Sequence, residues 1–265
     1  MNVFLREFKA HRKGLIWWSV GMFFLVYSGM AKFDAYQKSG VNVTKIFDTL
    51  PKAVKAVLGV RDVNLSTAIG FFVILFIYLI VMASIHAALL GAGVLTEEEL
   101  DRTTEFLFAK PISRAKAVAA KLSAALLNVT VLNLVTTVSS VAFVAAYNRG
   151  ESATTEVLLL MGGMYLAQLL FLSAGLAAAA IIKRPKRAAA VVSAYLFSAY
   201  FLSLWLDVTE KAQWLKYATP FKYFDAATIV KNTALNPVYF AISVSLTAVL
   251  GVLAFVFYQK RDLNV

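Results

Sequence analysis

Six long runs of apolar residues constrain this chain more than any other feature of its sequence. A helix needs about 20 apolar residues to cross a bilayer, and several of the runs reach that length. Of the 265 residues, 60% are hydrophobic, whereas a soluble domain averages roughly 45–50%. The runs lack the alternation of membrane β-strands. We therefore predict an all-α integral membrane protein, one transmembrane domain over residues 1–265, with spans at about 15–31, 67–95, 117–147, 156–182, 188–206 and 237–257.

The first 13 residues differ from the run that follows them. Phe4 and Phe8 share one helical face, and basic residues surround the rest. This pattern favours an amphipathic helix lying at the membrane surface over residues 1–13. The alternative is the basic part of a signal peptide with 15–31 as its apolar part, but that run is long and no Ala-x-Ala cleavage site follows it.

The positive charges indicate how the spans are oriented. Dense groups of Lys and Arg lie at the N-terminus, within 96–121, within 183–187 and at the C-terminus. Short basic segments next to spans stay in the cytoplasm, so we predict both termini inside, in a multi-pass protein of a bacterial plasma membrane. The net charge of +11 is expected of side chains that anchor spans to anionic lipid. We therefore expect membrane lipid as a partner and no nucleic acid.

The segment 96–121 is the longest strongly charged stretch between apolar runs. Glu98 and Arg102 form an i,i+4 pair in a short helical pattern. Pro111 cannot continue that helix, and Ser113 is a suitable N-cap for the next one. A charged helix held between two spans indicates a docking element, and an ordinary solvated loop is the alternative.

A resemblance adds to this pattern. The run Arg102-Thr103-Thr104-Glu105-Phe106-Leu107, followed by Lys110-Pro111-Ile112-Ser113-Arg114, resembles the cytoplasmic loop of the ABC-2 family of ABC-transporter membrane subunits. Arg102 stands where many members carry glycine. In that family the loop forms a coupling helix that fits a cleft on the ATPase subunit. The resemblance thus implies a coupling loop at 96–116, with ATPase contacts from Glu99, Arg102, Thr103, Glu105, Phe106 and Leu107.

The same resemblance implies the partners and the activity. It implies a cytoplasmic ABC ATPase subunit that uses ATP and Mg, and a second permease copy or a sister permease. It also implies export, the direction in which most of the family transports. The apolar spans and the short outer loops favour a hydrophobic or amphipathic substrate, such as an antimicrobial or toxin peptide or a drug. The alternatives are an ion-coupled secondary transporter, which needs charged residues deep in the spans, and a non-transporting membrane scaffold. We expect no charged side chain within a span core.

The chain lacks the motifs of an enzyme. It contains no Gly-Lys dipeptide, which a phosphate-binding P-loop requires, so ATP hydrolysis would belong to another polypeptide. It has no cysteine, and its two histidines, His11 and His86, fall in no metal-ligand spacing. We therefore predict no catalytic residue, no metal and no cofactor in this chain.

Polar side chains inside the spans are candidates for the lining of a transport path. Such groups either bond to a neighbouring helix or face a wet pathway, and the sequence leaves both open for His86, Asn128, Asn133, Gln168 and Tyr200. The stretch Thr219–Asp225, which mixes proline, aromatic and charged residues, predicts either short re-entrant helices or an exposed loop.

Overall fold

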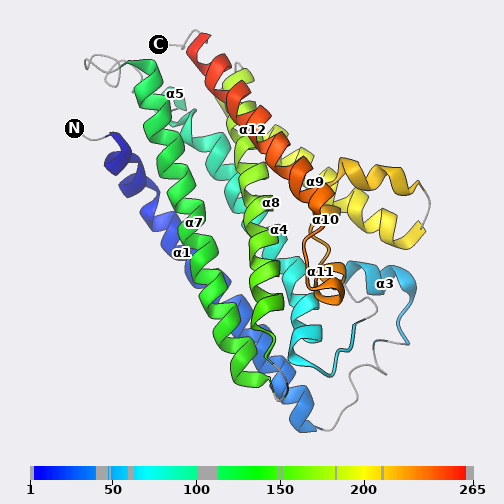
Figure 1. Ribbon diagram of the computed structural model, residues 1–265. Coiled ribbons are helices and arrows are strands. Elements are labelled where there is room, and N and C mark those ends of the chain that lie inside the picture. Colours follow the sequence, from blue (N-terminus) through cyan, green and yellow to red (C-terminus); the bar gives the residue numbers. More distant parts are fainter. Residues whose placement is uncertain are drawn as a thin grey trace.

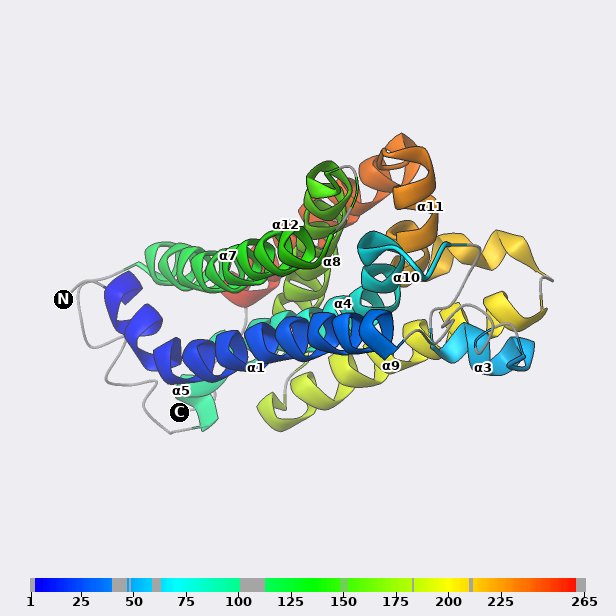
Figure 2. The same cartoon turned by 90° about the horizontal axis from the view of Figure 1, so that it is seen from below.

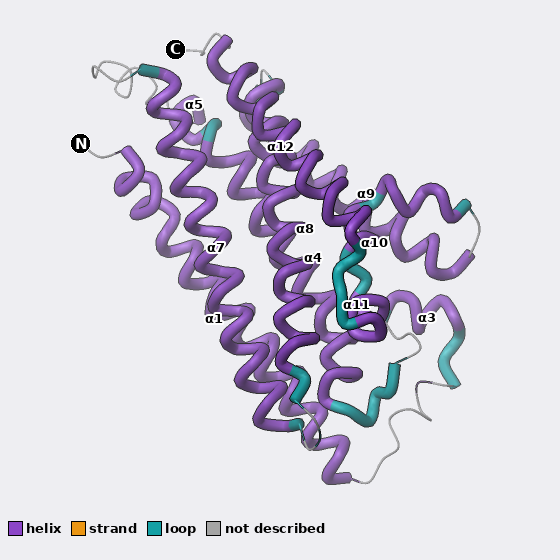
Figure 3. Tube along the Cα trace, in the orientation of Figure 1, coloured by secondary structure: helices purple, strands orange, loops and turns teal. Residues whose placement is uncertain are grey.

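The computed structural model describes residues 3–39, 47, 49–58, 63–100, 113–148, 150, 152–182, 184–209 and 212–260. Over these ranges the chain consists of helices and loops without a strand (Figure 1, Figure 3). Six of the described helices are long and apolar enough to cross a membrane, which confirms the predicted fold class. They are α1 (Val3–Ser39), α4 (Ala68–Val94), α7 (Arg114–Tyr147), α8 (Thr154–Ile181), α9 (Pro185–Thr209) and α12 (Pro237–Lys260).

Short helices connect the long ones. The described chain holds α3 (Lys52–Val57) between α1 and α4, and α5 (Glu97–Leu100) after α4. Between α9 and α12 lie the 3-10 helix η1 (Gln213–Ala218), α10 (Pro220–Tyr223) and α11 (Ala226–Asn232). The start of α1 and the end of α12 lie at the same end of the bundle, which we call the terminal end (Figure 1).

Side-chain caps fix where several helices begin. The Thr67 hydroxyl accepts a hydrogen bond from the backbone N–H of Gly70 at the start of α4. Ser113 caps α7 in the same way, through the N–H of Lys116, as the sequence predicts. Each cap satisfies a backbone donor that has no partner within its helix.

Helices α4 and α8 form the centre of the bundle. Their spanning windows are the most buried of the six, and the two pack closely along their length. Gly91 and Gly175 permit this approach: a Cβ added to Gly91 would lie 2.3 Å from the Leu172 carbonyl oxygen, and one added to Gly175 would lie 2.4 Å from that of Ala88. Small residues serve this purpose in membrane helices, where close van der Waals packing drives association.

The other long helices surround this pair. Helix α1 packs against α7 on one side, α12 packs against α8, and α9 packs against α4 and α8 (Figure 1). Seen from below, α3 lies beside the end of α9, away from the paired α1 and α7 (Figure 2). Helix α12 is the least buried of the six, and its many exposed apolar side chains suit a lipid-facing surface.

The first helix differs from its predicted form. The sequence predicts an interfacial helix over 1–13 and a separate span over 15–31, whereas α1 is one helix from Val3 to Ser39. Gly14 stands between the two predicted elements, but one glycine inside a helix costs only about 1 kcal/mol. Packing against α7 and α4 is sufficient to carry the helix through that position.

Candidate functional site

The predicted docking segment, 96–116, is described at its two ends only. Helix α4 leads through Leu95 and Thr96 into α5, and Ser113 opens α7 on the other side. Glu99 lies half-buried in α5. The other predicted ATPase contacts lie outside the described residues: Arg102, Thr103, Glu105, Phe106 and Leu107.

A buried ion pair binds both ends of this segment to the bundle. The Lys121 ammonium of α7 donates a hydrogen bond to the Glu7 carboxylate of α1 at 3.3 Å and another to the Val94 carbonyl oxygen at 2.7 Å. Both charged side chains are only about 1% exposed. Because Val94 ends α4, this one ammonium joins α1, α4 and α7 directly beside the docking segment.

Lys121 is a charged side chain that the bundle buries. It lies near the start of α7, beside the docking segment, and is 1% exposed, so the expectation of no charge within a span core stays a prediction. A buried ion can persist where a partner of opposite charge and further hydrogen bonds replace its hydration. Glu7 and the Val94 carbonyl oxygen supply both.

A second contact ties α1 to α5. The His11 Nε2 atom lies 3.5 Å from a carboxylate oxygen of Glu97. Glu7, His11 and Glu97 offer ligand atoms within 4.8 Å of one another, and this is the group of described residues that could hold a metal ion. The Lys121 ammonium also bonds to Glu7, and the expected lack of a metal in this chain stays a prediction.

The polar residues predicted as path lining lie in two buried pairs. His86 of α4 and Asn128 of α7 face each other closely enough to interact, and the Trp18 ring packs edge-on against His86 at a centroid distance of 5.3 Å. The Asn133 side-chain amide of α7 donates a hydrogen bond to the side-chain Oε1 of Gln168 in α8 at 3.0 Å. All four polar side chains are buried within the protomer, in the positions that suit bonds between helices.

Tyr200 lies apart from these pairs. It is half-buried on α9 and packs against the Phe221 ring of α10, with centroids 5.6 Å apart. It also lines a narrow cavity between α9, α10 and the first half of α4. The five predicted lining residues therefore fall in three places, and their role in a pathway stays a prediction.

Residues 212–236 form a folded cap at the ends of α9 and α12 that point away from the termini. Pro220, Phe221, Tyr223 and Phe224 are buried, which agrees with the predicted broken helices and not with an exposed loop. The Thr219 hydroxyl donates to the Ala199 carbonyl oxygen of α9 at 2.7 Å. The Phe224 ring rests over the backbone of α8, where a Cβ at Gly163 would lie 3.1 Å from it.

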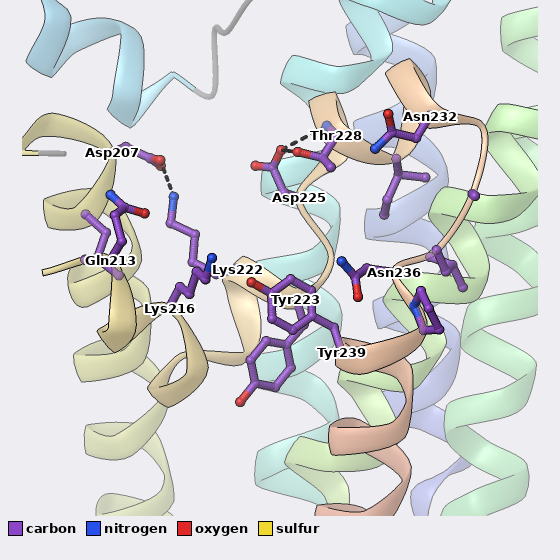
Figure 4. A pocket seen from close by; sticks show the side chains of 15 residues that line it. Asp207, Gln213, Lys216, Lys222, Tyr223, Asp225, Thr228, Asn232, Asn236 and Tyr239 are labelled. Carbon is purple, nitrogen blue, oxygen red and sulfur yellow. Dashed lines mark hydrogen bonds and ion pairs between the residues drawn. The ribbon is translucent and has the colours of Figure 1, made fainter. Parts of the chain in front are cut away.

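This cap borders an open cavity of about 570 Å³, which Figure 4 shows. Lys222 forms an ion pair with Asp207 at the end of α9. Asp225 caps α11 by accepting from the N–H and the hydroxyl of Thr228. The Tyr223 ring stacks on Tyr239 with centroids 5.1 Å apart.

Tyr223 is one of the residues that line the cavity. Burial raises the pKa of Tyr223 to about 12, so the phenol stays protonated at neutral pH. Its hydroxyl donates a hydrogen bond to the Tyr217 backbone carbonyl oxygen of η1. The cavity residues are not predicted as a site by the sequence, although the mixture of charge and aromatic residues in Thr219–Asp225 marks where it lies.

Comparison with known proteins gives one finding that covers nearly the whole chain. The family model described as ABC-2 family transporter protein matches residues 1–263. No curated protein matches the chain. The match extends from α1 through α12 and includes both the docking segment and the cap. With its six spanning helices, the chain is a multi-pass membrane protein that belongs to the ABC-2 family of transporter proteins.

Proposed function

We propose that this protein is the permease subunit of an ATP-driven exporter, and that a separate ABC ATPase docks on residues 96–116. The observation that carries the proposal is the buried Lys121 contact. It joins Glu7 of α1 and the last carbonyl of α4 to α7, so both ends of the docking segment are anchored in spanning helices. A displacement of that segment would therefore be transmitted to the spanning helices.

The packing of the bundle supports transmission beyond these ends. Helix α4 runs from the docking segment to the cap and lies against α8 at the Gly91 and Gly175 contacts. Movement of α4 would therefore move α8 as well, because the two helices pack closely at these glycines and closely packed helices move together as a rigid body. ATP-driven closure of the ATPase subunits would in this way change access to a pathway formed with a second permease copy.

The orientation follows from the proposed docking. The ATPase and its ATP and Mg are cytoplasmic, so the terminal end would face the cytoplasm and the cap would face outward. The basic groups near span ends favour the same orientation. A hydrophobic or amphipathic substrate, such as a peptide or drug, fits the apolar spans.

Co-purification from the native membrane tests the proposal. The tagged chain is compared with the variant Glu105→Arg/Leu107→Asp and with a control, Lys231→Gln, which changes an exposed charge on α11. We expect an ABC-type ATPase with the wild type and the control, and its loss with the double variant. Absence of an ATPase from all three, or equal retention by all three, would overturn the proposal.

A further inference from the structure

The 3-10 helix η1 presents aromatic side chains that the rest of the protein leaves uncovered. Trp214 is 72% exposed and Tyr217 is 50% exposed, and no residue of η1 is buried. Lys216 lies beside them, with its Nζ atom 5.5 Å from the centre of the Tyr217 ring. Amphipathic rings next to a lysine, whose apolar stem ends in a charge, are typical of the boundary between lipid and water.

The attachment of η1 to the bundle fixes the direction in which these rings point. The chain turns at Ala212, whose φ of 52° is left-handed, and η1 then packs against the end of α9 and against α10. The Tyr223 hydroxyl donates a hydrogen bond to the Tyr217 backbone carbonyl oxygen, and the Tyr217 and Tyr239 ring centroids lie 5.8 Å apart. One side of η1 is therefore held by the cap, and Trp214 lies exposed on the remaining surface.

An exposed apolar face of α9 leads toward η1. Phe197, Phe201 and Trp205 follow one another at intervals of four residues, and all three are exposed. Residues four apart lie on the same side of a helix, so these rings form one aromatic stripe along α9. Because α9 is one of the six spanning helices, lipid is the natural surrounding of this stripe. The uncovered rings of η1 extend the same kind of surface beyond the end of the helix.

The length of α9 determines the depth of η1. Arg187 is exposed in the first turn of α9, where a basic side chain suits the headgroup layer. From Arg187 to Thr209 the helix rises about 33 Å at about 1.5 Å per residue, and the hydrocarbon core of a bilayer is about 30 Å thick. Helix α9 therefore ends near the opposite headgroup layer. A deeper position of η1 would bring Lys216 into hydrocarbon, which is costly.

The exposed part of α11 differs from η1 in composition. The exposed residues of α11 are Thr228, Lys231 and Asn232, all of them polar. Polar side chains of this kind favour water, whereas exposed rings favour the interface. The cap therefore has two distinct surfaces, an aromatic one on η1 and a polar one on α11.

We propose that η1 anchors the cap in the headgroup layer of the bilayer. Trp214 and Tyr217 lie among the headgroups with Lys216 beside them, and α11 stays in water. The partner of this surface is the lipid bilayer itself. The anchor holds the end of α9 and the first part of the cap at the membrane surface. This inference goes beyond the proposed permease function and does not depend on ATPase docking.

Spin-label accessibility in lipid vesicles tests the position of η1. Because the chain has no cysteine, one introduced cysteine carries the single label. The full chain is reconstituted in vesicles of phosphatidylcholine and phosphatidylglycerol as Trp214→Cys, Phe197→Cys or Lys231→Cys. The second variant is the reference for hydrocarbon and the third is the reference for water. Collision with oxygen, which concentrates in hydrocarbon, and with a soluble nickel chelate, which stays in water, reports the depth of each label.

We expect the ratio of oxygen to nickel collisions to be highest at position 197, lowest at position 231 and intermediate at position 214. A nickel chelate attached to a lipid headgroup should relax the label at position 214 more than the other two. A label at position 214 that matches either reference, or that both soluble reagents fail to reach because protein covers it, would overturn the proposal.

Amide hydrogen exchange in the same vesicles tests the anchoring role. Trp214→Ala should make the amides of η1 exchange about three- to tenfold faster, because the free energy of burying the ring in the interface is lost. The matched control is Trp17→Ala, which removes another largely exposed ring, from α1, and should leave exchange in η1 unchanged. Unchanged exchange after Trp214→Ala, or the same increase in both variants, would also overturn the proposal.

Discussion

Replacing Lys121 by methionine should be one of the most damaging single changes in the terminal half of the bundle. The substitution keeps the length of the side chain and removes the ammonium that bonds to Glu7 and to the Val94 carbonyl oxygen. Breaking a buried pair in this way costs about 3–5 kcal/mol, because the remaining charge is left without its partner. Arg6 lies 3.8 Å from the Glu7 carboxylate and is more than a third exposed, so it offsets only part of this loss and we expect about 3 kcal/mol.

The free energy of unfolding in detergent, followed by tryptophan fluorescence, measures this effect. The control is Lys116→Met, one turn earlier on α7, where the side chain is exposed and the expected change is within about 0.5 kcal/mol. The double variant Lys121→Met/Glu7→Leu should recover most of the stability, since an apolar pair often replaces a buried ion pair at no cost. A single variant as stable as its control, or a double variant no better than the single one, would refute the reasoning.

The other predictions address packing, orientation and the cap. Gly175→Ala should destabilise the protein by about 1–3 kcal/mol through its clash with α4. Gly162→Ala, in open space on the same helix, should stabilise it by about 0.5–1 kcal/mol. Thermal unfolding of the two variants should therefore show a lowered midpoint for Gly175→Ala and a raised one for Gly162→Ala. Because the chain has no cysteine, a single introduced cysteine can be labelled alone. In intact cells a membrane-impermeant maleimide should react with Gln213→Cys and not with Lys116→Cys. The reverse pattern would contradict the proposed orientation. Thr219→Val removes the buried hydrogen bond from the cap to α9 and should lower the free energy of unfolding by about 1–3 kcal/mol. Native-state hydrogen exchange should become faster in the cap. An unchanged exchange rate there would contradict the role of this hydrogen bond in holding the cap on α9.

Sequence reasoning is sufficient for the elements whose signals are local. The six spans follow from the length of the apolar runs. The Ser113 cap follows from a hydroxyl residue directly after a proline break. For the cap, Pro220 and the aromatic residues around it leave broken helices and an exposed loop equally open, and only the burial of these residues in the structure decides for the helices.

The contacts that define the sites are not local, and the sequence does not reveal them. Glu7 and Lys121 are 114 positions apart, and nothing in either neighbourhood marks them as partners. Uniformly apolar spans carry too little periodicity to fix how each helix is rotated. The pairing of Asn133 with Gln168 and the separate position of Tyr200 therefore require the three-dimensional structure. Likewise, Asp207 and Lys222 meet only because the cap folds back onto α9.

Photo-crosslinking in the native membrane is the most direct test of the ATPase docking that we propose. A photoreactive amino acid is placed at Leu107 in the docking segment, and for comparison at Trp214 in the cap, where the side chain is exposed. Docking on 96–116 predicts a covalent adduct with an ABC-type ATPase from position 107 and none from position 214. No ATPase adduct from position 107, or the same adduct from both positions, would contradict the proposed permease function.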